Sequence, residues 1–194
     1  MKRSIVFLAL CCGFFFSCNK TNEKSNAIVP EDQFIEYIIP KGGHYANINP
    51  FKTVQYNELK FIAWFDNTAI YQTSDPNNQE DINKLFGFSD NNEQHQQYSA
   101  RIGWNWARNA LRLYAYVYNN GNRSFTEITS VSLQTEINCS IKINGSQYIF
   151  TVNNTSVEMP RSSSTAESEG YKLYPYFGGD ETSPHDIHIW IKEI

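Results

Sequence analysis

The chain has 194 residues, a length typical of one domain or of two small ones. It carries 16 Lys and Arg against 20 Asp and Glu, a formal net charge of -4, so it lacks the clustered basic excess of proteins that bind nucleic acid. Hydrophobic residues make up 41% of the chain and aromatic residues 15%, which supplies a packed core and excludes intrinsic disorder. We therefore expect a folded domain and no nucleic-acid partner.

The beginning of the chain is typical of an export signal. It opens with Met-Lys-Arg, and residues 4–16 form an almost wholly apolar stretch that is too short to cross a bilayer core of ~30 Å as a helix. A small residue, Ser17, then precedes Cys18, and the chain turns polar at once. This pattern is typical of a bacterial lipoprotein signal, in which the Cys thiol accepts a diacylglyceryl group and becomes the new N-terminus. We expect a signal peptide over residues 1–17, lipidation of Cys18 and a polar tether over residues 18–33.

Lipidation implies a location at the outer membrane, on its periplasmic or cell-surface face, anchored by acyl chains such as palmitate. The alternative is an ordinary secretory peptide in which Cys18 is incidental. Cys11 and Cys12 fit a lipidation signal less well, because cleavage there would halve the apolar stretch. With Cys18 acylated, Cys139 is the one cysteine left in the mature chain, so we expect no intramolecular disulfide and a buried, inert thiol.

From Phe34 onward, the pattern of apolar residues favours strands. Short apolar or alternating runs stand at residues 60–65, 138–143, 148–152 and 186–191. Turn signals lie between them: Asn119-Asn120-Gly121, Asn144-Gly145 and Gly178-Gly179-Asp180. Residues 79–87 are the exception and predict one short helix, with acids in its first turn and Gly87 at its end. Many short strands in a domain of this size indicate an all-β sandwich or barrel over residues 34–194.

One hairpin is predicted in detail. Residues 98–106 and 110–118 alternate in character, and Arg108-Asn109 fits a two-residue turn because Asn tolerates positive φ. On one side this turn pairs Trp106 with Leu111, Trp104 with Leu113, Ile102 with Ala115 and Ala100 with Val117. On the other side it pairs Asn105 with Arg112, Gly103 with Tyr114, Arg101 with Tyr116 and Ser99 with Tyr118. A slip of one residue would mix the two sets, so we expect the first side in the core and the second as a solvated polar-aromatic surface.

Several stretches resemble a group of uncharacterised Bacteroidota lipoproteins. They are residues 65–71, 81–90, 99–104, 159–161 and 170–181. More loosely, the strand pattern and the ending at residues 177–179 and 184–187 are similar to concanavalin A-like jelly rolls. That superfold holds lectin-type modules, polysaccharide lyases and glycoside hydrolases, so the resemblance implies a jelly-roll sandwich and glycans as the ligand class.

The polar-aromatic side of the hairpin is the candidate glycan-binding face. It comprises Arg101, Asn105, Arg112, Tyr114, Tyr116 and Tyr118. Tyr rings offer flat surfaces for sugar rings, Arg and Asn bind hydroxyl groups, and we expect Arg101 to lie over the ring of Tyr116 in a cation–π contact. The alternative is architectural, because Tyr is favoured in strands and Tyr114 would cover the bare backbone of Gly103. We expect a non-catalytic glycan-binding or adhesion module.

Two enzymatic activities are the alternatives to a binding module. Retaining hydrolysis needs two carboxylates, and the Glu-x-Asp-x-x-Glu spacing of jelly-roll hydrolases is missing. A uronate lyase needs a cation to neutralise the carboxylate, and an acid and a base such as Tyr and His. Gln94, His95 and Arg101, together with Arg112, Tyr114 and Tyr116, could supply them, although the Gln-x-His and Tyr-x-Lys pieces of alginate-lyase-like jelly rolls are missing. The lyase is the alternative function.

A calcium ion and a protein partner complete the expectations. Asp186, after the Gly178-Gly179 turn, could bind structural Ca²⁺ with backbone carbonyls, although no Asp-x-Asp-x-Asp loop is present. The alternative is that Asp186 caps a turn or pairs with Lys172. No transition metal is expected, because His185 and His188 lack zinc-ligand spacing and Cys partners. A structural or accessory subunit of an envelope complex is the second alternative function.

Overall fold

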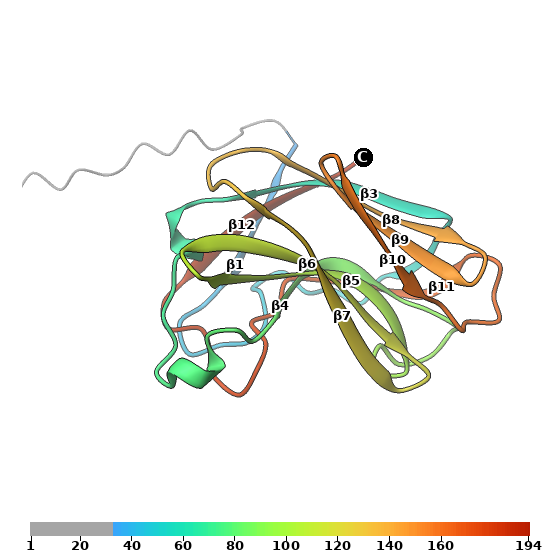
Figure 1. The fold of residues 1–194 in the computed structure, drawn as a ribbon, viewed down its shortest axis with the longest axis horizontal. Coiled ribbons are helices and arrows are strands. Elements are labelled where there is room, and N and C mark those ends of the chain that lie inside the picture. The colour runs from blue at the N-terminus through green and yellow to red at the C-terminus, as the bar shows by residue number, and fades with distance from the viewer. Residues whose placement is uncertain (1–32) are drawn as a thin grey trace, which may run out of the picture.

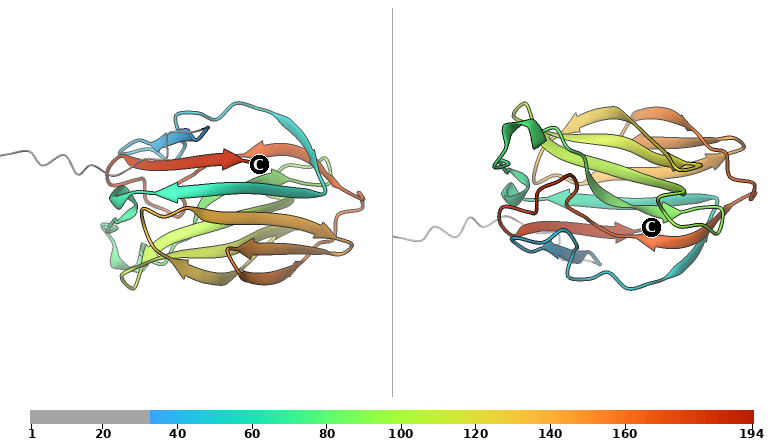
Figure 2. Two further views of the ribbon diagram at one scale, coloured as in Figure 1. Left: turned by 90° about the horizontal axis from the view of Figure 1, so that it is seen from above. Right: turned by 90° about the horizontal axis from the view of Figure 1, so that it is seen from below.

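The computed structural model describes residues 33–194. The expected signal peptide, the lipidation site at Cys18 and residues 18–32 of the expected tether lie outside the described residues, so they stay predictions. Residues 33–194 fold into two six-stranded sheets that pack face to face, as the views in Figure 2 show. The all-β sandwich expected from the sequence is therefore confirmed. No helix in this part of the chain is long and apolar enough to cross a membrane.

The first sheet contains both ends of the described chain, because the first strand of the chain pairs with the last one (Figure 1). Its order is β1 (Ile35–Ile39), β12 (Ile187–Glu193), β3 (Glu58–Phe65), β8 (Ile137–Asn144), β9 (Gln147–Val152) and β10 (Thr155–Pro160). All pairings within it are antiparallel. The four runs expected as strands are thus β3, β8, β9 and β12.

The second sheet carries the candidate site. Its order is β2 (Thr53–Tyr56), β11 (Ser168–Leu173), β4 (Asn83–Ser89), β5 (Tyr98–Ala107), β6 (Ala110–Asn119) and β7 (Asn122–Val131). Four of these strands, β4 to β7, follow one another in sequence as an antiparallel meander. β11 comes from near the C-terminal end and lies between β4 and the edge strand β2.

The predicted hairpin is β5 and β6, and its register is confirmed at every expected pair from Trp106–Leu111 to Ser99–Tyr118. Arg108 and Asn109 both adopt positive φ, at 52° and 58°, which is the conformation that a type I′ turn requires. Because side chains alternate along a strand, this register places Trp104 on the inner face and Arg101 on the outer face. Trp104 is wholly buried and its ring lies 5.2 Å from that of Phe65 on the opposite sheet.

The prediction of a helix over residues 79–87 is wrong. The structure has a short 3-10 turn at Pro76–Asn78, capped by the carboxylate of Asp75, and then the strand β4. A short apolar run cannot be assigned to helix or strand by periodicity alone, and here the neighbouring strand decides. β4 pairs with β5 along most of its length, with an irregularity between Lys84 and Phe86 that hides the period-two pattern.

A buried ion pair connects the two sheets at one end of the sandwich. Asp90 follows β4 and Arg161 follows β10, and Arg161 Nε donates to Asp90 Oδ2 at 2.8 Å. Tyr148 of β9 donates to the same oxygen at 2.6 Å. Burial by itself raises the pKa of the Asp90 carboxyl, but the hydrogen bonds from Arg161, Tyr148 and the Asn91 N–H outweigh it and hold that pKa below its ordinary value.

Candidate functional site

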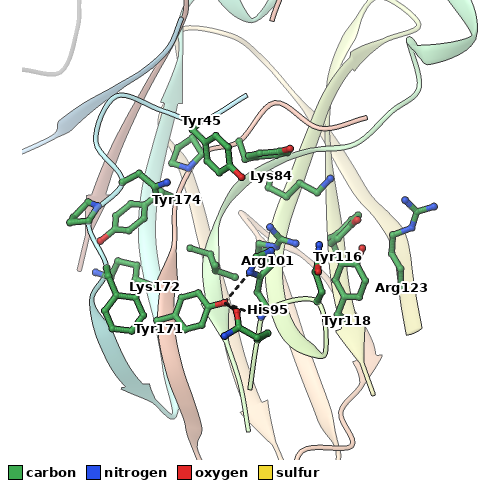
Figure 3. A pocket seen from close by; sticks show the side chains of 18 of the residues that line it. Tyr45, Lys84, His95, Arg101, Tyr116, Tyr118, Arg123, Tyr171, Lys172 and Tyr174 are labelled. Carbon is green, nitrogen blue, oxygen red and sulfur yellow. Dashed lines mark hydrogen bonds between the residues drawn. The ribbon is translucent and has the colours of Figure 1, made fainter. Parts of the chain in front are cut away.

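A cleft of about 680 Å³ lies on the outer face of the second sheet (Figure 3). Strands β4, β5, β6, β7 and β11 form its floor, and the loop over residues 40–52 and the segment over residues 174–180 form its rim. Its lining combines aromatic rings (Tyr45, Phe51, Tyr116, Tyr118, Tyr171, Tyr174, Tyr176) with cations (Lys84, Arg101, Arg123, Lys172), His95 and the amides of Gln94 and Gln96. Among the described residues that line the cleft, Asp180 is the one acid.

The centre of the floor is a cross-strand row of four residues. Gly87 of β4 lies opposite Arg101 of β5, Arg101 lies opposite Tyr116 of β6, and Tyr116 lies opposite Phe125 of β7. The absence of a side chain at Gly87 makes room for Arg101, because a Cβ there would lie 2.8 Å from Arg101 Cγ and 2.1 Å from the carbonyl oxygen of Ala100. The Arg101 guanidinium lies 5.4 Å from the centre of the Tyr116 ring, so the expected cation–π contact is present.

Arg101 is buried without a counter-charge from the residues that the structure describes. The residue exposes 6% of its surface, and its Nε has no hydrogen-bond partner among residues 33–194. The ion pairs of this part of the chain use Arg108, Arg112 and Arg161 but not Arg101. Burial lowers the pKa of the Arg101 guanidinium. Arginine nevertheless stays protonated in proteins, so a positive charge lies at the centre of the cleft.

Lys84 brings a second positive charge to the same place. Its Nζ lies 4.6 Å from the centre of the Tyr116 ring and donates to the carbonyl oxygen of Ile82 at 2.7 Å. Burial, followed by repulsion from Arg101 and Arg123, lowers the pKa of the Lys84 ammonium to about 8. Lys84 is therefore partly neutral just above physiological pH.

His95 and Tyr171 form a hydrogen-bonded pair beside Arg101 (Figure 3). The main-chain N–H of His95 donates to the hydroxyl oxygen of Tyr171 at 3.0 Å, and His95 Nδ1 lies 2.9 Å from that oxygen. Burial, followed by repulsion from Arg101 and Lys84, lowers the pKa of His95. The imidazole is thus neutral at pH 7 and able to accept a proton.

The rim presents two exposed aromatic side chains. Phe51 exposes 77% of its surface and its ring lies 5.4 Å from that of Tyr171. Tyr45 exposes 63% and meets the ring of Tyr176 edge-on at 4.9 Å. These two side chains give the polar cleft an exposed aromatic edge, and exposed apolar surface of this kind often marks an interaction site.

The structure separates the six candidate glycan-face residues into two groups. Arg101, Tyr116 and Tyr118 line the cleft. Asn105, Arg112 and Tyr114 do not, and their polar atoms already have partners. Tyr114 donates to Asn105 Oδ1 at 3.2 Å, the Asn105 amide donates to the Glu80 carbonyl oxygen at 3.1 Å, and Arg112 pairs with Glu127 at 2.6 Å. A role for these three in ligand binding stays a prediction.

The outer face of the hairpin is not solvated as expected. Tyr116 exposes only 3% of its surface and Tyr114 5%. The ring of Phe125 stacks on Tyr116 at 6.3 Å, and Lys84 covers the same ring, so side chains of the neighbouring strands bury what the isolated hairpin would expose. The largely exposed rings of the cleft, Phe51 and Tyr45, lie at its rim instead.

Several lining residues do not stand out in the sequence. Lys84 lies in the range predicted as a helix, whereas β4 points it into the cleft next to Arg101. Tyr171 stood in the stretch over residues 170–181 that carries the lipoprotein resemblance, and its alternation with Lys172 could have indicated a strand face. Phe51 and Tyr45 lie in a loop, where no periodic pattern distinguishes them.

The described residues gather no cluster of metal ligands around Asp186, the expected calcium ligand. Within residues 33–194, no group of three or more His, Cys, Asp or Glu side chains could hold a metal ion. Asp186 Oδ1 accepts the main-chain N–H of Lys41 at 2.8 Å, which agrees with a role in a turn. Lys172 pairs with Glu193 rather than with Asp186. Calcium at Asp186 stays a prediction.

The thiol of Cys139 is buried as expected. The residue exposes 4% of its surface and faces the core from β8, and burial raises its pKa. A thiol in such surroundings is a poor nucleophile, so it takes no part in the cleft.

Solved structures with a similar fold include polysaccharide-degrading enzymes. An alginate lyase from a Chlorella virus matches with a TM-score of 0.52 and 13% identity over 82% of each chain. Alginate lyase AlyC3 matches with a TM-score of 0.56 and 12% identity over 83% of this chain and 74% of that one. A family 16 endo-glucanase from Bacteroides ovatus matches with a TM-score of 0.55 and 10% identity over 83% and 80%.

At identities this low, the likeness shows the fold alone. The chain has a jelly-roll β-sandwich domain, as the concanavalin-like resemblance implied. No protein-family model matches the sequence, and no curated protein matches it. The resemblance to Bacteroidota lipoproteins stays an expectation.

Proposed function

We propose that this protein binds a polysaccharide in the cleft on its second sheet. The observation that carries the proposal is the cleft itself, an open hollow of about 680 Å³ that is lined by seven aromatic rings and by hydrogen-bonding side chains. Aromatic faces stack on sugar rings while polar side chains bind hydroxyl groups, which is the combination that a glycan requires. The fold supports it, because similar structures include two alginate lyases and an endo-glucanase.

We further propose that a lipid on Cys18 presents this domain at the outer membrane. The support is the basic start, the apolar stretch over residues 4–16 and the Ser17-Cys18 junction. The polar tether that follows would hold the domain away from the lipid surface. An anchored binding module keeps its polysaccharide next to the cell.

A second candidate function, a polysaccharide lyase, is favoured by the His95–Tyr171 pair next to Arg101. In an elimination, a base takes the proton at C5 of a uronate, the C4–O bond breaks, the electron pair forms a C4=C5 double bond, and the leaving oxygen takes a proton. A neutral His95 can serve as the base, Tyr171 as the acid, and Arg101 can neutralise the carboxylate. Hydrolysis is not proposed, because it requires two carboxylates and Asp180 is the one acid in the described lining.

The binding proposal is tested at the exposed rim, where a truncation leaves the core intact. A polysaccharide array identifies a ligand, and calorimetric titration then compares wild type with Phe51→Ala and Tyr45→Ala. We expect affinity to fall about tenfold or more for each, which is about 1.4 kcal/mol of binding free energy, because each truncation removes a ring on which a sugar stacks. Melting temperatures should stay unchanged. Ile35→Ala, which removes a half-exposed apolar side chain on the other sheet, is the matched control and should keep full affinity.

Two outcomes would favour one of the other functions. An ultraviolet signal of unsaturated product from a bound uronate polymer, lost in His95→Ala and Tyr171→Phe, would favour the lyase. Binding to no polysaccharide would contradict the proposal and leave an accessory subunit of an envelope complex, which capture of a specific envelope protein would support.

A further inference from the structure

We propose that the polysaccharide is acidic and that its carboxylate or sulfate group binds in the cleft at Arg101 and Lys84. The inference rests on the proposed function and names the class of ligand. The observation that carries it is the positive charge of Arg101, which lines the cleft, is buried and has no acidic partner in the described part of the chain.

Two other cations in the described part of the chain, Arg161 and Lys172, expose only 5% and 7% of their surface, and both have acidic partners. Arg161 pairs with Asp90, and Lys172 pairs with Glu193. Arg101 is as buried as these, but residues 33–194 offer it neither an acid nor an acceptor for its Nε–H. A buried charge without a partner is costly to the fold, so an anion from outside is the group that this site lacks.

Neighbouring groups increase the positive charge around Arg101 instead of neutralising it. Lys84 faces Arg101 of β5 and Arg123 of β7, and both lower its pKa, whereas Asp81 acts weakly in the opposite sense. The uncharged rings of Tyr116 on β6 and Tyr176 on the rim complete the surroundings of Lys84, at 4.6 Å and 6.0 Å from its Nζ. The cleft as a whole therefore attracts anions, because like charges gathered in a partly dry hollow concentrate the field.

The two cations are held in one part of the cleft by a shared ring. Lys84 and Arg101 lie 4.6 Å and 5.4 Å from the centre of Tyr116, and Figure 3 shows both in the middle of the hollow with aromatic side chains on either side. A guanidinium binds the two oxygens of a carboxylate or sulfate through paired N–H groups, and an ammonium adds a point charge. A chain whose anionic group is held at the centre would place its neighbouring sugars on the rings at the rim.

This arrangement predicts a proton coupling. A bound anion stabilises the protonated form of Lys84, so binding at pH 8 to 9 takes up a proton, and affinity falls as the pH rises through about 8. His95 adds positive charge at acidic pH, because its neutral form at pH 7 becomes protonated. Affinity for an acidic chain is thus expected to rise as the pH falls.

The test uses the purified full chain and three classes of polymer: oligouronates from alginate or pectin, a sulfated galactan, and a neutral β-glucan. We expect binding to one or both acidic classes, weaker with added salt, and no measurable binding to the neutral polymer. Binding of the oligouronates but not of the sulfated galactan would assign the carboxylate as the group recognised. Binding of the sulfated galactan but not of the oligouronates would assign the sulfate. Titrations at pH 8.5 in two buffers of different ionisation enthalpy should show proton uptake.

The variant Arg101→Met separates ligand binding from a structural role. We expect affinity for the acidic chain to fall about tenfold or more, because the charge-assisted hydrogen bonds to the anion are lost, while the melting temperature stays the same or rises. Arg108→Met, which removes an exposed cation at the hairpin turn, is the control and should change neither. If Arg101→Met does not fold, Lys84→Gln and the salt dependence of wild type give the same test.

Two results would overturn the inference. Equal binding of neutral and acidic polymers, with Arg101→Met unaffected, would show that the ligand is not chosen by charge, although the proposed binding function would stand. A large loss of stability in Arg101→Met with no change in affinity would assign Arg101 to the fold. Binding of no polymer at all would remove the proposed function itself.

Discussion

Asp90 and Arg161 lie 71 positions apart in the sequence and form an ion pair in which the two side chains expose 0% and 3% of their surface. The pair holds the end of β4 against the segment that follows β10. Ser163 and Thr165 donate to Asp90 Oδ1, at 3.2 Å and 3.3 Å, so the segment after β10 is fixed around one carboxylate. The loop that carries His95 begins directly after Asp90.

Removing the carboxylate should destabilise the domain strongly. Asp90→Ala leaves the Arg161 guanidinium buried without its partner, and we expect a loss of about 3–5 kcal/mol in the free energy of unfolding. Chemical denaturation at pH 7 measures it, and Arg161→Met with Asp90→Leu in one chain is the control that removes both charges. A double variant no more stable than Asp90→Ala would contradict the idea that the unpaired Arg161 charge causes the loss.

The stability contributed by the Asp90 carboxylate should also depend on pH. Because the pKa of Asp90 is lowered in the fold, this contribution to the free energy of unfolding should vanish as the pH falls through that folded-state pKa.

Trp104 should be among the most sensitive core positions. Its side chain is wholly buried and its ring contacts those of Phe65 and Tyr71 at 5.2 Å and 5.9 Å. Trp104→Ala is expected to cost about 3–5 kcal/mol, the usual range for a buried aromatic side chain. Thermal unfolding measures the loss, and an unchanged melting temperature would place Trp104 at the surface.

Gly87→Ala should disturb both the fold and the cleft. The new Cβ would lie 2.1 Å from the carbonyl oxygen of Ala100, a contact that only a shift of β4 or β5 relieves. We expect a loss of about 1–3 kcal/mol, in the range for overpacking, and weaker ligand binding because Arg101 is displaced. Gly145→Ala is a useful contrast, since its Cβ would meet nothing within 4 Å although its φ of +59° is strained. Equal stability of wild type and Gly87→Ala would show that the strands yield without cost.

Lys84 should make stability depend on pH in the free protein. In the fold its pKa lies at about 8, below the ordinary value of 10.5, so the unfolded chain binds more protons between these two pH values. The contribution of Lys84 to the free energy of unfolding therefore rises as the pH increases from about 8. Denaturation of wild type and Lys84→Met at pH 7.5 and 9.5 should show the difference between them narrowing. A constant difference would mean that the ammonium is not destabilised by its surroundings.

The lipid anchor is tested outside the described domain. Cys18→Ala removes the acceptor thiol, and we expect the protein to leave the membrane fraction, since stable anchoring requires more than one acyl chain. Carbonate washing followed by sedimentation measures the distribution. A Cys18→Ala protein that still sediments with membranes would contradict lipidation at that residue.

The hairpin was predictable from the sequence to the level of individual pairs, because a two-residue turn and strict alternation leave one register that separates apolar from polar residues. β4 was not, because its buried run and its irregularity between Lys84 and Phe86 give no clear period. The placement of Lys84 and Tyr171 depends on the pairing of β4 with β11, segments more than 80 positions apart, which nothing local specifies. The burial of Arg101 and Tyr116 likewise depends on side chains contributed by β4 and β7.

Cys139 provides a built-in reporter of how the domain opens. Its strand β8 is hydrogen-bonded on both sides, to β3 and β9, so a thiol reagent reaches the sulfur only after the first sheet separates. The rate of thiol labelling under native conditions thus reports how often the first sheet, which lies on the side away from the cleft, opens. If a ligand on the second sheet slows that labelling by the factor 1 + [L]/Kd, the two sheets open together as one cooperative unit. A labelling rate that ignores the ligand would mean that the first sheet opens while the binding face stays folded.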